Sequence, residues 1–243
     1  MKLFGHRGAS ADFPENTLEA FEGAVVQGAD GVELDVMRCG SGELVVCHDE
    51  SLERLAGQGL RVGETPLWKL KRCDVGSRLG FSPATIPELG EVFELLPAEF
   101  EVNIELKCDT LDDRGLAVEV AKFLNAGHGA DRVIVSSFNP ACLLRFADRA
   151  PGVRRGQLLD PDRPRFRQES LWTRLTSNYS IHPPNVWCDE ASVARWKAAG
   201  LAIATWTVDD AVEARRLESL GVDVVMTNKP GALRRALKIQ PDR

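Results

Sequence analysis

Short apolar segments typical of β-strands alternate with segments typical of amphipathic helices along almost the whole chain. Strands joined by helices of this length pair in parallel, through right-handed crossover connections. About eight such units in a chain of 243 residues match a closed (β/α)8 barrel of the TIM type. A doubly wound open sheet is the alternative. No Gly-x-Gly-x-x-Gly motif follows a predicted strand, which weakens the dinucleotide-binding version of that sheet.

The predicted elements follow one another closely. Strands are expected over residues 3–5, 31–37, 43–47, 100–107, 133–137, 153–159, 179–182, 201–207 and 222–227. The first helix is expected to begin at a cap formed by Asn16 or Thr17 and to end at Gly28. Later helices are expected over residues 116–124, 141–147, 171–175, 191–199, 211–220 and 232–237. We find no internal repeat and no linker, and we expect a single domain over residues 1–243.

One segment, residues 50–85, breaks the alternation with glycines and charges. We predict that it is a small insertion after the strand carrying His48, lying over the mouth of the barrel. A disordered loop is the alternative, but the segment contains several apolar residues that can pack: Leu60, Val62, Leu67, Trp68 and Leu70.

The overall composition argues against several classes of protein. The net charge of -6 does not suit a nucleic-acid-binding protein or a strongly anionic membrane surface. No apolar run approaches the roughly 18 residues of a membrane span, and no apolar leader precedes the first motif. The six cysteines form no Cys-x-x-Cys pair, so we expect buried reduced thiols, with a disulfide framework as the alternative. We therefore expect a soluble, cytoplasmic protein that binds no nucleic acid; its oligomeric state is not indicated.

Three carboxylates, Glu33, Asp35 and Glu105, lie on predicted strands that are otherwise apolar. Glu33 and Asp35 are two residues apart, so they point to the same side of their strand, into the barrel. Two like charges there repel each other and lose hydration. A hard divalent cation relieves the repulsion, and oxygen ligands suit magnesium or calcium. Glu105 would be the third ligand; ion pairing with Arg7 or Lys107 is the alternative.

Two cations and an aromatic residue accompany these acids. Arg7 and Lys107 favour a bound anion such as phosphate, because Arg offers two parallel hydrogen bonds and Lys a point charge. Charge balance alone is the alternative. Trp206 ends a predicted strand, where an indole is able to pack against a glycerol or choline group. A core tryptophan is the alternative for this position.

Two of the four histidines, His6 and His48, end predicted strands close to the carboxylates. Imidazole titrates near neutral pH, so a pair of histidines supplies one acid and one base. Cleavage of a phosphodiester needs such a pair. His128 lies in a glycine-flanked loop and is expected to be solvated. His182 ends a strand, and the sequence leaves open whether it lines the site.

Taken in order along the chain, these residues resemble the glycerophosphodiester phosphodiesterase family. The matching segments are residues 6–8 (His-Arg-Gly), 14–17 (Pro-Glu-Asn-Thr), 20–21, 31–36, 45–49, 52–54, 104–107 (Ile-Glu-Leu-Lys), 136–138, 205–208 and 221–223. Each segment alone is a weak signal, but the ordered set is specific and spans nearly the whole length.

The resemblance implies a (β/α)8 barrel with a small insertion and hydrolysis of glycerophosphodiesters to glycerol 3-phosphate and an alcohol. By motif position, it implies an acid–base pair, His6 and His48, and metal ligands Glu33, Asp35 and Glu105. It also implies that Arg7 and Lys107 bind phosphate and that Asn16 orients the site. Mg²⁺ is the expected ion because of the expected compartment, with Ca²⁺ as the alternative.

Other functions remain open at this stage. A lysophospholipase-D-like enzyme would use the same site, with an apolar entrance supplied by Leu60, Val62, Leu67 and Trp68. A barrel that binds a phosphate ligand without turnover is a second alternative, and a metal-dependent isomerase or aldolase is a third. The sequence does not indicate the head group of the substrate, or which histidine is the acid and which the base.

Overall fold

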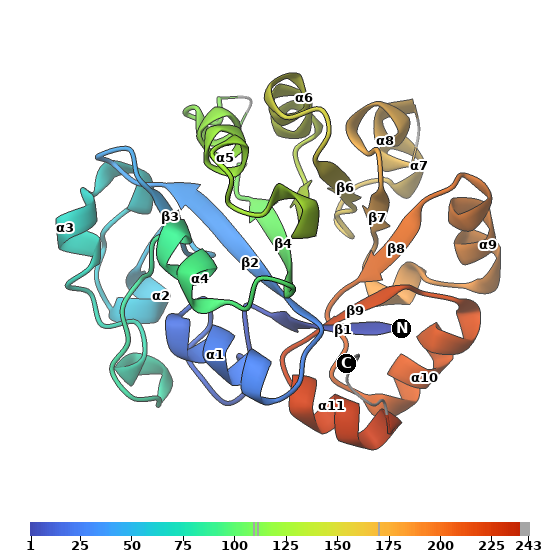
Figure 1. Cartoon of the computed structure of the whole chain (residues 1–243), viewed down its shortest axis with the longest axis horizontal. Helices are drawn as coiled ribbons and strands as arrows, with labels where there is room; N and C mark the ends of the chain where they lie inside the picture. Colours follow the sequence, from blue (N-terminus) through green and yellow to red (C-terminus); the bar gives the residue numbers. More distant parts are fainter. Residues whose placement is uncertain (109, 111, 170, 239–243) are drawn as a thin grey trace.

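Parallel strands close into a barrel in the computed structural model, which describes residues 1–108, 110, 112–169 and 171–238 (Figure 1). The strands are β1 (Lys2–His6), β2 (Gly31–Arg38), β4 (Glu101–Leu106), β5 (Val133–Ser137), β6 (Arg154–Leu158), β7 (Ser180–His182), β8 (Ala202–Thr205) and β9 (Val224–Thr227). Each pairs in parallel with the next, and β9 pairs with β1 to complete the ring. The predicted (β/α)8 barrel is confirmed.

Helices surround the barrel and connect its strands (Figure 1). They are α1 (Leu18–Val26), α4 (Leu89–Leu95), α5 (Leu116–Asn125), α6 (Pro140–Arg149), α7 (Arg165–Gln168), α8 (Leu171–Thr176), α9 (Glu190–Ala198), α10 (Ala211–Leu220) and α11 (Pro230–Leu237). Further 3₁₀ turns lie between the ring strands at Ala130–Arg132 and Asn185–Trp187. Helix α4 forms despite Gly90 in its first turn, because Glu88 and Glu91 make a reciprocal capping box.

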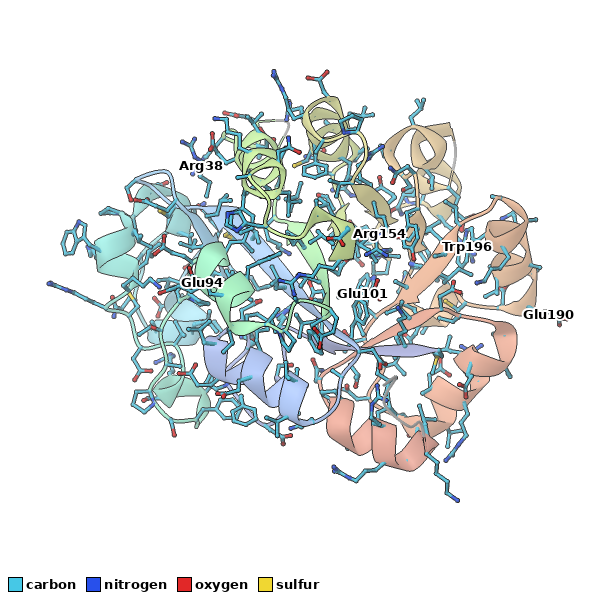
Figure 2. The ribbon with its side chains drawn as sticks, in the orientation of Figure 1. Arg38, Glu94, Glu101, Arg154, Glu190 and Trp196 are labelled. Atoms are coloured by element: carbon cyan, nitrogen blue, oxygen red, sulfur yellow. The ribbon has the colours of Figure 1, made fainter. Side chains whose placement is uncertain are left out.

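Alternation within β2 separates the core from the barrel interior, as predicted. Val32, Leu34 and Val36 are fully buried in the layer between the barrel and the helices. Glu33 and Asp35 point the other way and are buried inside the barrel. At the opposite end of the barrel, Glu101 pairs with Arg154, and Figure 2 labels both. The starts of β4 and β6 are thus joined by an ion pair, far from the carboxyl ends of the strands.

The strand before His48 is not part of the ring. Strand β3 (Leu44–Val46) pairs antiparallel with β2. The segment that follows forms α2 (Glu53–Ala56), α3 (Leu67–Leu70) and 3₁₀ turns at Val62–Glu64 and Ser77–Leu79. It packs beside the carboxyl end of β2, where Gly40 N donates to Thr65 O at 2.9 Å.

Packing inside this segment differs from the expectation at one residue. Leu52, Val62 and Leu70 are fully buried in a small core of their own, and Leu60 and Leu67 pack against it. Trp68, which the sequence grouped with them, is 61% exposed. It lies on the outer side of the short helix α3, where its ring stacks against the Arg72 guanidinium at 5.3 Å.

Two further observations concern the class of protein. Within the described ranges, no helix combines the length and the apolar character that crossing a bilayer requires. All six cysteines lie in the described part of the chain as free thiols, and all but Cys108 are buried.

Candidate active site

A cavity opens at the carboxyl ends of the barrel strands. Active sites of (β/α)8 enzymes form at this end of the barrel. One part of the wall is polar or ionic, and the other is apolar. The lining residues are His6, Arg7, Glu33, His48, Asn103, Glu105, Lys107, Phe138, Leu158, Trp206 and Met226. Seven of the nine predicted site residues are among them, and the other two, Asp35 and Asn16, are buried directly behind the wall.

The three predicted carboxylates meet inside the barrel. The register of β2 and β4 places Asp35 opposite Glu105, with Glu33 one inward position before Asp35. One oxygen from each of the three carboxylates lies within 4.8 Å of the others, and all three side chains are buried. A shared ion is therefore within reach of all three residues.

Two cations contact this cluster. Arg7 Nε lies 3.2 Å from Asp35 Oδ2, and Lys107 Nζ lies 2.9 Å from Glu105 Oε1 and 3.6 Å from Asp35 Oδ1. The ion pairs left open by the sequence therefore form in this structure. Three carboxylates against two cations leave one excess negative charge, so pairing alone does not neutralise the cluster.

The acids titrate unusually because they are buried together. Burial, and then the charges of Asp35 and Glu105, raise the pKa of Glu33 well above its ordinary range. Burial raises the pKa of Glu105 to about 7, although Lys107 opposes the shift. Burial also acts to raise the pKa of Asp35, but Arg7 and Lys107 outweigh it and hold that pKa below its usual range. The cluster thus retains a proton near neutral pH unless another positive charge replaces it.

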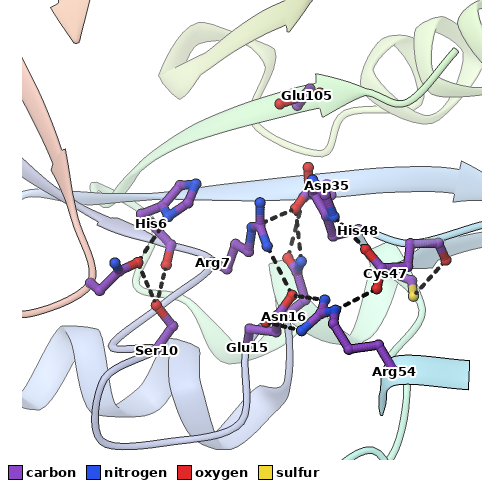
Figure 3. A network of polar contacts seen from close by, with 12 residues as sticks. His6, Arg7, Ser10, Glu15, Asn16, Asp35, Cys47, His48, Arg54 and Glu105 are labelled. Atoms are coloured by element: carbon purple, nitrogen blue, oxygen red, sulfur yellow. Dashed lines mark hydrogen bonds and ion pairs between the residues drawn. The ribbon is translucent and has the colours of Figure 1, made fainter. Parts of the chain in front are cut away.

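These residues fit a divalent cation. Asp35 Oδ1 is buried and has no hydrogen-bond partner in the described structure, with Lys107 Nζ at 3.6 Å, so one acid has an oxygen available to a cation. The other oxygen, Oδ2, is held by Asn16, whose Nδ2 donates to it at 2.8 Å. Asn16 Oδ1 in turn accepts from the Asp35 backbone N–H at 3.3 Å. These two bonds fix the Asn16 amide and, through it, the carboxylate of Asp35 (Figure 3).

The backbone of the loop after β1 adopts an uncommon conformation at two site residues. Arg7 and Asn16 both have positive φ angles, of 56° and 58°. This left-handed conformation is uncommon for residues other than glycine. Arg7 N also donates to Glu33 Oε2 at 3.1 Å, so the turn itself contacts the carboxylate cluster. Thr17, not Asn16, caps α1, which leaves the Asn16 side chain free to serve the site.

Hydrogen bonding fixes the tautomer of His6. Its Nδ1 lies 2.9 Å from Asn228 Oδ1, while Asn228 Nδ2 donates to Asp209 Oδ2 at 2.8 Å. Because a carboxylate only accepts, the Asn228 amide must present its oxygen to His6. The neutral ring therefore carries its proton on Nδ1, and Nε2, 3.9 Å from Glu33 Oε2, keeps the lone pair. Burial, and then Arg7, lower the pKa of His6.

His48 has a different partner. Its Nδ1 lies 2.6 Å from the Asp49 carboxylate, which accepts a hydrogen bond from the ring. Asp49 also accepts from Arg54 Nε at 2.6 Å, and Arg54 donates to Glu15 at 2.8 and 2.9 Å. This chain of ion pairs connects the segment after β3 to the loop after β1 (Figure 3). The two imidazoles therefore differ in the group that contacts Nδ1: an amide oxygen for His6 and a carboxylate for His48.

The apolar wall is built around Trp206. Its ring packs edge-on against Phe138 with 5.6 Å between ring centroids, and its Nε1 donates to His182 O at 3.1 Å. His182 itself does not line the cavity. Its ring is fully buried, Nε2 contacts Ser180 Oγ at 2.8 Å, and burial lowers its pKa to about 3. His128 is exposed, and its ring stacks on Phe123.

Sequence reasoning did not assign several residues that the structure places here. Asn103 lies two positions before Glu105 on β4, and the same period-two argument would have turned it toward the cavity. Asp49 adjoins His48 in the sequence. Asn228 gave no such signal, because it is 222 residues away from His6.

A protein-family model described as the glycerophosphoryl diester phosphodiesterase family matches residues 6–232. The chain belongs to this family. Membership confirms the resemblance inferred from the motifs, and it identifies the chain as an enzyme of the phosphodiesterase class.

Similar proteins cover nearly the whole chain. A glycerophosphodiester phosphodiesterase from Caldanaerobacter subterraneus subsp. tengcongensis is 35% identical over 240 residues, 95% of each chain. One from Bacillus altitudinis is 32% identical over 248 residues, 99% of this chain and 98% of the relative. A phosphodiesterase from Oleispira antarctica was solved in complex with the product sn-glycerol-3-phosphate. It superposes with a TM-score of 0.85 at 31% identity, covering 98% of this chain and 97% of that one.

Proposed function

We propose that this enzyme hydrolyses glycerophosphodiesters to sn-glycerol 3-phosphate and an alcohol, using a divalent cation and two histidines. The observation that carries the proposal is the convergence of three buried carboxylates within 4.8 Å beside His6 and His48. The product bound in the Oleispira antarctica relative and the names of the curated relatives support this substrate class.

The cation would be held by Glu33, Asp35 and Glu105, and Mg²⁺ suits this all-oxygen donor set. When bound, it neutralises charge on the phosphate oxygens. Arg7 and Lys107 would bind the same phosphate from the side of the cavity that they line. Asn16 would act indirectly, by holding Asp35 in the orientation that presents its Oδ1 to the cation.

The partners of the two histidines suggest their roles. His6 is held neutral with its lone pair on Nε2, so it would take the proton from the attacking hydroxyl, either the glycerol 2-hydroxyl or a water. His48, whose Nδ1 contacts the Asp49 carboxylate, would then be the group that gives a proton to the departing alcohol. A P–O bond forms to the attacking oxygen as the P–O bond to the alcohol breaks. If the 2-hydroxyl attacks, the product is a cyclic phosphate that water then opens.

The apolar wall would receive the carbon skeleton of the substrate. Trp206 and Phe138 line the cavity as a pair packed edge to face, and they would contact a glycerol unit there. The lysophospholipid alternative required an apolar entrance from the segment after β3. Among the described residues, none of its candidates, Leu60, Val62, Leu67 and Trp68, lines the cavity. The structure therefore offers the lysophospholipid alternative no specific support. A cytoplasmic location stays a prediction from the sequence.

The test is an assay of alcohol release from glycerophosphocholine. We expect EDTA to abolish activity and Mg²⁺, Ca²⁺ or Mn²⁺ to restore it to different extents. His6→Ala and His48→Ala should each lower kcat by a factor of about 10²–10⁴. His128→Ala is the matched control, because this histidine is exposed and outside the site. Near-normal turnover by either active-site variant, or full activity in EDTA, would refute the proposal.

A further inference from the structure

Asn103 occupies a position equivalent to that of the three carboxylates. In the register of β2 and β4, Glu33 lies opposite Asn103, and Asp35 lies opposite Glu105. All four side chains point into the barrel, because they occupy alternate positions on two neighbouring strands. The four side chains form one polar patch, which consists of three carboxylates and one carboxamide.

The Asn103 carboxamide has one atom bonded and one atom free. Asn103 is 1% exposed, and its Nδ2 donates to Ser136 Oγ at 2.9 Å. Its Oδ1 is buried and has no hydrogen-bond partner among the described residues. A buried carbonyl oxygen without a partner is rare in folded proteins, and such a group calls for an explanation. Asn103 lines the same cavity as Glu33 and Glu105, so a ligand in that cavity is the available partner.

We propose that Asn103 Oδ1 is a fourth protein oxygen for the divalent cation held by Glu33, Asp35 and Glu105. This inference rests on the cation site of the proposed function. Amide carbonyl oxygens are ordinary ligands of hard cations such as Mg²⁺ and Ca²⁺. In the structure Asn103 Nδ2 donates to the Ser136 hydroxyl, and Oδ1 is the amide atom left without a protein partner.

A neutral fourth ligand also suits the charge of the site. Three carboxylates, a divalent cation, Arg7 and Lys107 together carry one net positive charge, which matches the single negative charge of a phosphodiester. An aspartate at position 103 would cancel that charge. It would hold the cation at least as tightly but would attract the phosphate less. The amide thus adds an oxygen ligand without weakening phosphate binding.

The experiment measures Mg²⁺ and Mn²⁺ binding directly, by calorimetry on protein freed of metal with EDTA and dialysed at pH 8. Asn103→Leu should raise the Kd for the cation by tenfold or more, a loss typical of disturbed metal sites. Asn103→Asp should leave the Kd unchanged or lower it. In the presence of saturating Mg²⁺, this second variant should bind sn-glycerol 3-phosphate several-fold more weakly than the wild type.

Gln157→Leu is the matched control, since Gln157 is a buried amide on β6 whose side chain is fully bonded and absent from the cavity. Its cation affinity should equal that of the wild type, and circular dichroism would verify that each variant folds. If Asn103→Leu binds the cation within twofold of the wild type, this inference alone is overturned. If the wild type binds no divalent cation, the metal requirement of the proposed function fails, and this inference fails with it.

Discussion

Replacing Glu105 by glutamine should make the metal-free enzyme more stable at alkaline pH. Burial raises the pKa of Glu105 from an ordinary value of 4.5 to about 7. A tenfold change in proton affinity corresponds to about 1.4 kcal/mol, so ionising this buried acid in the folded state costs about 3 kcal/mol above both pKa values. Glutamine is neutral at every pH and does not carry this cost.

The sign of the pH dependence follows from proton binding. Between pH 4.5 and 7, the folded state keeps the Glu105 proton while the unfolded state has lost it, so the free energy of unfolding falls as pH rises. From pH 5 to pH 8, this one group lowers the stability of the wild type by about 2.5 kcal/mol relative to Glu105→Gln. Glu33, whose pKa burial also raises, steepens the fall in both proteins.

The assay is urea denaturation in EDTA at pH 5, 6.5 and 8, with the free energy of unfolding compared between the two proteins. Glu94→Gln is the control, since Glu94 is exposed on α4 (Figure 2). Adding Mg²⁺ at about 100 times its Kd should then stabilise the wild type by about 2.7 kcal/mol, and the variant by much less. If the free energy of unfolding of the wild type and of Glu105→Gln in EDTA changed in parallel with pH, the argument that burial raises the pKa of Glu105 would be refuted.

Three further predictions concern the partners of the histidines and the scaffold. Asp49→Asn should lower kcat for glycerophosphocholine by about 10²-fold with little change in KM, because an amide does not supply the negative charge that the Asp49 carboxylate places 2.6 Å from His48 Nδ1. Asn228→Ala should lower kcat by about tenfold and leave KM nearly unchanged, since His6 loses the acceptor that fixes its tautomer; steady-state kinetics measure both effects. Asp210→Ala removes the cap whose carboxylate accepts from Val212 N and Glu213 N at 2.9 Å, and it should cost about 1 kcal/mol, or about 2–4 °C in Tm, without changing kcat.

Each of these predictions has a contrary outcome. A wild-type kcat in Asp49→Asn would mean that the carboxylate does not support proton transfer by its neighbour. A change confined to KM in Asn228→Ala would assign this amide to substrate binding. Loss of activity in Asp210→Ala at unchanged Tm would contradict a purely structural role for the cap.

The barrel and its acidic cluster were predictable because both depend on local periodicity. Alternation of strands and helices fixed the fold class, and the two-residue spacing of Glu33 and Asp35 fixed which way they face. The helix boundaries agree closely where a cap or a glycine marks them, as at Thr17 and Gly221. These signals lie within a few residues of the feature they determine.

Features that depend on tertiary contacts were not predictable. Nothing near His6 in the sequence indicates Asn228, because the closing of the ring between β1 and β9 brings them together. Trp68 was expected to pack, but α3 is only four residues long and turns this side chain outward. His182 ends a strand as the site histidines do, but its ring is fully buried, contacts Ser180 and does not line the cavity.

In the proposed mechanism, His48 and the carboxylate cluster belong to different parts of the fold. His48 follows the antiparallel strand β3, whereas the carboxylates lie on the ring strands β2 and β4. The eight ring strands pair with one another without it, so the hairpin that delivers His48 is an appendage on an already complete scaffold. Changes in the length of that appendage would shift the imidazole relative to a carboxylate cluster that stays in place. On the proposed roles, such changes would move the histidine beside the departing alcohol without moving the carboxylates that would hold the cation.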